Sequence, residues 1–235
     1  MSIIITQIIA VILGYILGIV VLIRNKKEHS RLATYFVYAD ILLSSAILIY
    51  TAALIFRNSY TYIDVLSKLV VGFAISYAYR MAYTIKVGPR KLIDNILIYS
   101  PIVMFTIDAF IILNSPVLHR NDIFSITTGL TPAYFTAVIN FVYGIVIVGI
   151  LISSFLEIRK ADPQAAWKPF FIALGLLVIS LLDSLPNIFP KSYTARIIGS
   201  LGNIIGYAIV SIKLFEKAPN MEEKESIPPS QNINK

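Results

Sequence analysis

The 235-residue sequence contains no cysteine and only two histidines, His29 and His119. The absence of cysteine excludes disulfides, thiolate nucleophiles and cysteine-ligated metals. The spans proposed below place the two histidines in connections on opposite sides of a membrane. A bis-histidine haem or a histidine-ligated zinc is therefore not expected. The sequence predicts no metal site and no cofactor.

Charge is also scarce. Charged residues make up 14% of the chain and hydrophobic residues 57%, whereas about a quarter of the residues of a soluble domain are charged. Most of this chain is therefore expected to lie in lipid. The length leaves room for seven spans of about 20 residues with short connections. The fold class predicted is an all-α integral membrane protein, a bundle of seven transmembrane helices.

Seven apolar segments define the expected spans, and several of their ends are marked by proline or glycine. The segments are 2–23, 33–56, 65–85, 92–114, 133–156, 169–190 and 197–214. Together they form a transmembrane domain over residues 1–215. The polar segment 216–235, which is rich in glutamate and proline, is expected to be a disordered cytoplasmic tail.

The basic residues indicate the orientation, because loops rich in lysine and arginine stay in the cytoplasm. With the N-terminus outside the cell and the C-terminus inside, the outer flanks hold only Arg57, Arg120, Lys191 and Arg196. The inner flanks hold Arg24, Lys26, Lys27, Arg31, Lys86, Arg90, Lys91, Arg159, Lys160, Lys168, Lys213, Lys217, Lys224 and Lys235. We predict a multi-pass protein of the cell membrane. Its net charge of +7 is attributed to topology and to attraction for membrane lipids, and no nucleic-acid partner is expected.

Familiar catalytic motifs are missing. The sequence has no glycine-rich phosphate loop, nucleophile elbow or metal-binding cluster, so it predicts no enzyme and no catalytic residues. A retinal Schiff base would need a lysine near the middle of the last span. The only lysine there is Lys213, at the cytoplasmic end, so a retinal photoreceptor is not expected.

Polar residues within the spans are the candidate functional positions, because ionisable groups in a bilayer are costly when they face lipid. Counted at about 1.5 Å per residue, four of them lie about 10 Å below the outer surface: Asp108, Asn140, Asp183 and Asn203. Near the same level lie Gln7, Thr51, Lys68 and Asn187. One interpretation is the floor of an outward-facing ligand cavity beside Pro186. The alternative is hydrogen bonding that only packs the helices together.

A second polar layer lies nearer the cytoplasm, where Asp40 and Arg80 reach similar depths. We predict a buried ion pair between them that fixes the register of two neighbouring helices. The alternative is that Arg80 extends to the inner headgroups.

Glycines four residues apart allow close helix contacts. Such pairs occur at Gly14 and Gly18 in the first span and at Gly202 and Gly206 in the last. We predict that these two helices pack together within one molecule. A contact between molecules is the alternative, so the oligomeric state is open.

Several short segments carry a resemblance to a known family. They are Arg24-Asn25-Lys26-Lys27, Leu32-Ala33-Thr34-Tyr35-Phe36, Leu113-Asn114-Ser115-Pro116-Val117-Leu118-His119, Arg159-Lys160 and Ile212-Lys213-Leu214-Phe215. On these the chain resembles the seven-helix N-terminal sensor region of membrane histidine kinases. That family continues into a cytoplasmic output domain, whereas this sequence ends in a short tail. The resemblance therefore implies a separate cytoplasmic or membrane signalling partner.

The preferred hypothesis is a stand-alone sensor or receptor-like protein that binds a small or lipid-soluble ligand in the outer cavity. A small transporter or proton-coupled carrier, using Asp108 or Asp183, is the first alternative. A structural subunit of a membrane complex, with the four glycines as its contact surface, is the second.

Overall fold

The computed structural model describes residues 2–28, 30–56, 59–87, 93–115, 130–189 and 192–214. These residues fold into seven α-helices without a strand: α1 (Ser2–Glu28), α2 (Arg31–Ile55), α3 (Tyr60–Val87), α4 (Ile93–Leu113), α5 (Leu130–Ala161), α6 (Trp167–Ile188) and α7 (Tyr193–Leu214). The all-helical prediction is confirmed. The expected tail, 216–235, lies outside the described residues, as do His29 and His119.

Five of the helices are long and apolar enough to cross a membrane: α1, α2, α3, α5 and α6. Helix α5 has 32 residues and so spans roughly 48 Å, more than the hydrocarbon thickness of a bilayer. In α4 the corresponding apolar stretch, Ile98–Leu113, is shorter. These features are those of a multi-pass membrane protein.

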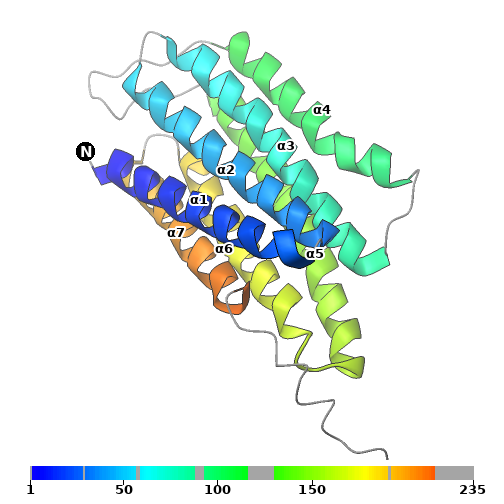
Figure 1. Cartoon of the computed structure of the whole chain (residues 1–235). Helices are drawn as coiled ribbons and strands as arrows, with labels where there is room; N and C mark the ends of the chain where they lie inside the picture. The colour runs from blue at the N-terminus through cyan, green and yellow to red at the C-terminus, as the bar shows by residue number, and fades with distance from the viewer. Residues whose placement is uncertain are drawn as a thin grey trace, which may run out of the picture.

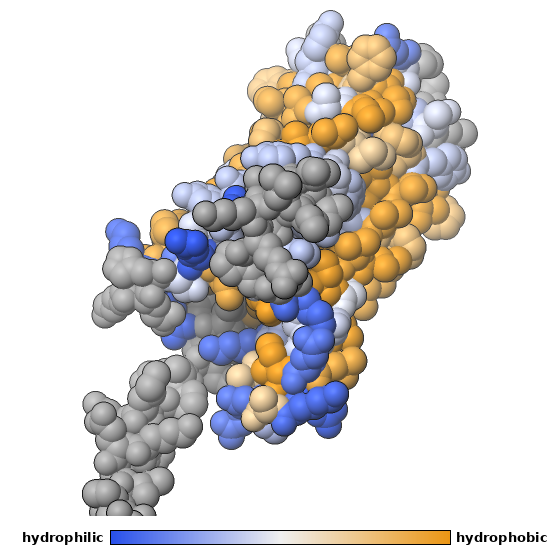
Figure 2. All heavy atoms as spheres, turned by 90° about the vertical axis from the view of Figure 1, so that its right-hand side faces the viewer, coloured by the Kyte–Doolittle hydropathy of each residue, from blue (hydrophilic) through white to orange (hydrophobic). Residues whose placement is uncertain are grey.

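Apolar side chains cover the outside of the bundle. On α1 they include Ile5, Ile12, Ile16 and Ile23, and on α5 they include Val138. Figure 2 shows an apolar surface running along most of the face it presents, with hydrophilic residues gathered at its lower end. A soluble bundle would present polar residues there, so this surface fits a lipid environment.

Successive helices run in opposite directions through the bundle (Figure 1). Helices α1, α2, α3, α5, α6 and α7 form a closed ring in which each contacts the next and α7 contacts α1. Helix α4 contacts α3 and α5 and lies outside this ring. Membership of the ring decides which side chains reach the centre of the molecule.

Local capping fixes the turns between neighbouring helices. Ser30 is the N-cap of α2, where its hydroxyl accepts a hydrogen bond from the Ala33 amide. Between α5 and α6 the Asp162 carboxylate accepts hydrogen bonds from the amides of Gln164 and Ala165, each at 3.0 Å. Such short connections place consecutive helices side by side and antiparallel.

Candidate functional site: a charged cavity in the helix ring

A cavity of about 210 Å³ lies at the centre of the ring. Side chains of α1, α2, α3, α5, α6 and α7 line it, whereas among the described side chains of α4 only Phe105 does. Its polar lining lies mostly toward one end of the bundle, the end that contains the N-terminus of α1: Gln7, Tyr50, Tyr60, Asp64, Ser67, Lys68, Thr136, Asn140, Ser180, Asp183, Asn187, Arg196, Ser200 and Asn203. This volume is below the roughly 300–1,000 Å³ of typical ligand pockets, but it exceeds the cavity of about 150 Å³ that can bind benzene, so it can hold a small organic molecule.

Helix α3 places two charges in the cavity wall. Tyr60, Asp64 and Lys68 follow each other at four-residue intervals and therefore share one helix face. Asp64 is buried, and its Oδ1 has no hydrogen-bond partner in the described part of the chain. Lys68 interacts electrostatically with Asp64, Asp108 and Asp183. Among the described residues no ion pair within 4.0 Å joins the Lys68 ammonium to any of these carboxylates.

Helices α6 and α7 supply the opposite wall. Asn203 donates a long hydrogen bond of 3.4 Å from Nδ2 to Asp183 Oδ1, while its own Oδ1 has no partner among the described residues. Pro186 and Asn187 line the cavity one helical turn from Asp183. Asn140 of α5 lines it as well. The structure thus brings Lys68, Asn140, Asp183, Asn187 and Asn203 around one space.

Asp108 does not line this cavity. It is fully buried on α4, and its Oδ2 accepts a hydrogen bond of 2.7 Å from Thr136 of α5. The expectation that Asp108 faces the cavity is therefore wrong, because α4 lies outside the ring. Asp108 instead takes part in a hydrogen bond that joins two helices, as the alternative interpretation expected. The 3.0 Å hydrogen bond from Thr51 of α2 to Gln7 of α1 joins two helices in the same way.

Apolar clusters lie at both ends of the cavity. Toward the N-terminus of α1, Ile3, Ala53, Leu54 and Tyr60 form one buried cluster. Toward the other end lies a larger cluster that includes the cavity-lining residues Ala78, Met81, Ile147, Tyr207 and Val210. The described polar groups are therefore held between two apolar layers. A ligand would have to displace or pass the first cluster to enter from that end.

The expected ion pair between Asp40 and Arg80 is not formed. Asp40 is 5% exposed, and neither of its carboxylate oxygens has a hydrogen-bond partner within the described residues. Arg80 is exposed, with its guanidinium 4.8 Å from the ring centre of Tyr35. Arg80 follows Ala78, a cavity-lining residue, by two positions. At about 100° per residue this turns Arg80 to the opposite side of α3.

Only one of the four glycines, Gly14, lies in the predicted contact between the first and last helices. Helices α1 and α7 are neighbours, and Gly14 lies between Ser44 of α2 and Tyr207 of α7. Gly18, however, lies against α2, and Gly202 and Gly206 lie against α6. A Cβ on Gly206 would stand 2.8 Å from the Gly175 carbonyl oxygen. All four positions are thus used inside the molecule.

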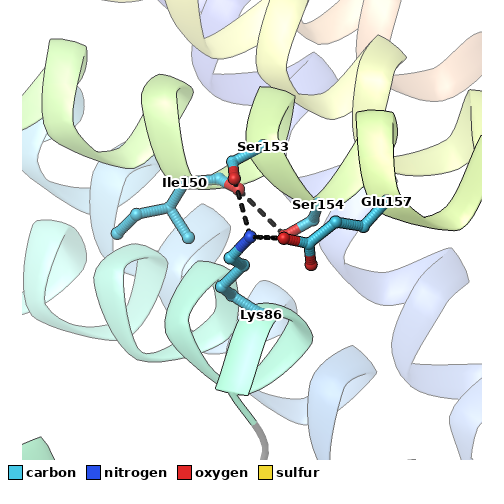
Figure 3. Close-up of polar contacts among 5 residues, drawn as sticks. All are labelled: Lys86, Ile150, Ser153, Ser154 and Glu157. Carbon is cyan, nitrogen blue, oxygen red and sulfur yellow. Dashed lines mark hydrogen bonds and ion pairs between the residues drawn. The ribbon is translucent and has the colours of Figure 1, made fainter.

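A polar contact at the other end of the bundle joins α3 to α5. Figure 3 shows the Lys86 ammonium between Ser153 and Glu157. Lys86 Nζ donates to Ser153 Oγ at 2.7 Å and forms an ion pair with Glu157. The Ser154 hydroxyl donates to the Ile150 carbonyl in the same turn of α5. This contact links α3 directly to α5, which are neighbours in the ring because α4 lies outside it.

The sequence analysis missed Asp64, Tyr60 and Arg196 as lining residues. The predicted third span began at residue 65, whereas α3 begins at Tyr60, so Asp64 was left in a loop. Arg196 was likewise assigned to an outer flank, but it is buried on α7 and lines the cavity. The four-residue spacing from Asp64 to Lys68 could have indicated that Asp64 is a lining residue, because it places both charges on one helix face.

The fold and the site define a class of protein: an all-helical bundle with several helices long and apolar enough to cross a membrane, arranged around a charged internal cavity. No family model, curated protein or solved structure matches the chain. The resemblance to histidine-kinase sensor regions stays a prediction. Among the described residues no group of three or more His, Cys, Asp or Glu side chains is close enough to hold a metal ion.

Proposed function

We propose that this protein is a receptor-like membrane sensor that binds a small or lipid-soluble ligand in the cavity of the helix ring and signals through a partner protein. The observation that carries the proposal is the set of charged side chains around empty space. Asp64, Lys68 and Asp183 face the cavity without direct ion pairs among the described residues. Such groups are costly inside a bilayer unless a function retains them.

The proposed orientation is N-terminus outside and C-terminus inside, with α4 and α7 also crossing the membrane. Its support is the charge distribution. Most of the basic side chains described at helix ends collect where α1, α3 and α5 end: Arg24, Lys26, Arg31, Lys86, Arg159, Lys160 and Lys168. Arg196, near the start of α7, lies at the other end. The polar part of the cavity lies toward the opposite end, which this orientation turns outward.

A ligand screen tests the proposal. Purified protein in lipid nanodiscs would be screened against small amphipathic molecules for a rise in the thermal unfolding midpoint. Any ligand found should bind Asp183→Asn at least about tenfold more weakly, as expected for the loss of one charged contact. Asp162→Asn, the same change in the exposed α5–α6 turn, should bind like the wild type. Equal binding by Asp183→Asn, or no ligand at all, would contradict the proposal.

A carrier is the second candidate, because cavity-lining residues extend from Ile3 to Val210, near opposite ends of the bundle. A carrier would have to move its substrate past the apolar clusters at both ends, which favours the receptor. Flux in proteoliposomes separates the two. A ligand from the screen that binds but produces no uptake or pH change supports the receptor, whereas ligand-dependent uptake supports the carrier.

A structural subunit is the weakest candidate. The glycines suggested as its contact surface, Gly14, Gly18, Gly202 and Gly206, pack against α2, α6 and α7 of the same chain.

A further inference from the structure

Asp40 stands apart from the other buried carboxylates. Within the described residues Thr136 donates to Asp108, Asn203 donates to Asp183, and Lys68 interacts electrostatically with both of these and with Asp64. Asp40 forms no hydrogen bond to a side chain and no ion pair among those residues, and the polar group that acts on it is the backbone of Gly18 on α1. It nevertheless lines the cavity.

The surroundings of Asp40 give its carboxylate little solvation. Most side chains in this part of the cavity are apolar: Phe36, Ala39, Leu43, Ala78, Met81 and Val210. The Tyr207 hydroxyl, which interacts electrostatically with Asp40, adds a polar group to them. One Asp40 oxygen lies beside α1, where a Cβ on Gly18 would come within 3.0 Å of it. A carboxylate in such a place is stable when a cation accompanies it. Arg80, which was expected at a similar depth in the membrane, is exposed and faces away from the cavity.

The interior of the bundle also carries more negative than positive groups. Its buried or cavity-lining acids are Asp40, Asp64, Asp108 and Asp183, and its bases are Lys68 and Arg196. The imbalance favours a positively charged occupant over a neutral or negative one.

We propose that the ligand of this cavity is an amphipathic organic amine whose ammonium group pairs with Asp40. This inference rests on the proposed function and names the chemical class of the ligand. The apolar side chains around Asp40 would contact the carbon skeleton next to the amine. An inorganic cation would need several oxygen ligands, and the lining near Asp40 offers chiefly carbon.

The geometry also sets the length of the ligand. Ser67 of α3 donates a hydrogen bond to the Ala46 carbonyl of α2, so the neighbouring Lys68 lies close to the level of Ala46. Asp40 precedes Ala46 by six residues, which places it about 9 Å farther along the bundle. An elongated amine that pairs with Asp40 therefore reaches the polar groups around Lys68 and Asp183 with its other end.

Three probes of equal size and different charge test the inference: 4-phenylbutylamine, 4-phenylbutanol and 4-phenylbutanoate. Their affinities for the full chain in nanodiscs would be measured by calorimetry and by the shift in the unfolding midpoint. We expect the amine to bind at least about tenfold more tightly than the alcohol or the acid. Asp40→Asn should remove this preference and leave the affinity for the alcohol within about twofold. Asp162→Asn should retain the preference.

The outcomes separate the two proposals. If the alcohol binds as tightly as the amine, the cavity accepts ligands but Asp40 is not an ammonium site, and only this inference fails. The same conclusion follows if Asp40→Asn binds the amine like the wild type. If none of the three probes binds, this inference fails, and the ligand screen decides the proposed function. Should Asp40→Asn not fold, the comparison of the three probes on the wild type decides alone.

Discussion

At the scale of single residues, the bond between Thr136 and Asp108 is the polar contact with the largest expected effect on stability. Both side chains are buried, and the hydroxyl donates at 2.7 Å. Replacing the donor leaves a buried carboxylate oxygen without its partner, which costs more than the bond itself contributes.

We therefore predict that Thr136→Val lowers the free energy of unfolding by about 1–3 kcal/mol. The measurement is unfolding in mixed detergent micelles. Thr106→Val is the matched control, because Thr106 is exposed and its hydroxyl bonds only to its own helix, at the Ile102 carbonyl. The control should change the free energy of unfolding by less than about 0.5 kcal/mol. Equal effects at the two positions would show that the Asp108 contact is not buried as described.

The ion pair between Lys86 and Glu157 should matter much less. The two side chains are 26% and 61% exposed, and solvent screens exposed pairs strongly.

Glu157→Gln is predicted to cost less than about 1 kcal/mol of unfolding free energy, and less still at high salt. The same unfolding assay at low and high salt measures both values. A cost larger than that of Thr136→Val would mean that this contact is shielded from solvent.

At the scale of helices, close packing between α6 and α7 depends on residues without a Cβ. Gly175 and Gly206 face each other's carbonyl oxygens, and an added Cβ would stand 2.7 and 2.8 Å from them. Gly149 on α5, in contrast, has nothing within 4 Å of the position that a Cβ would take.

Gly206→Ala should lower the free energy of unfolding by about 1–3 kcal/mol, since the helices must move apart to admit the methyl group. Gly149→Ala should leave it unchanged or raise it by up to about 1 kcal/mol through helix propensity. Unfolding curves of both variants provide the comparison. A neutral Gly206→Ala would contradict the packing described for these helices.

The helices are also the scale at which the sequence was most and least informative. Long apolar runs follow from hydropathy, so the seven helices were predictable. Depth along each helix could be counted from its end, and it assigned Lys68, Asn140, Asp183 and Asn203 to similar levels; all four line the cavity. Rotation about the helix axis and the order of helices around the ring depend on tertiary packing, which no single residue encodes. Arg80 and Asp108 were misplaced for that reason.

Span ends were the other source of error, because hydropathy does not fix them to better than a few residues. Helix α3 extends one turn beyond the apolar run, and that turn holds Asp64. A polar residue at the end of a helix can thus face an internal cavity even though the polar segment around it suggests a loop.

At the scale of the whole molecule, the account depends on a membrane around the ring and on one orientation of the bundle within it. Apolar side chains cover the outside, charged side chains line the inside, and basic residues gather at one end. These three features support the proposal that lipid surrounds the ring and that a ligand binds within it.

The most direct test is cysteine labelling in intact cells, which the natural absence of cysteine makes clean. Tyr62→Cys reports on the end of the bundle near the N-terminus of α1, where Tyr62 is 73% exposed. Gln164→Cys reports on the exposed α5–α6 turn at the opposite end. A membrane-impermeant maleimide should label Tyr62→Cys in intact cells and Gln164→Cys only after permeabilisation. Labelling of Gln164→Cys in intact cells would contradict the account, and so would recovery of the protein in the soluble fraction.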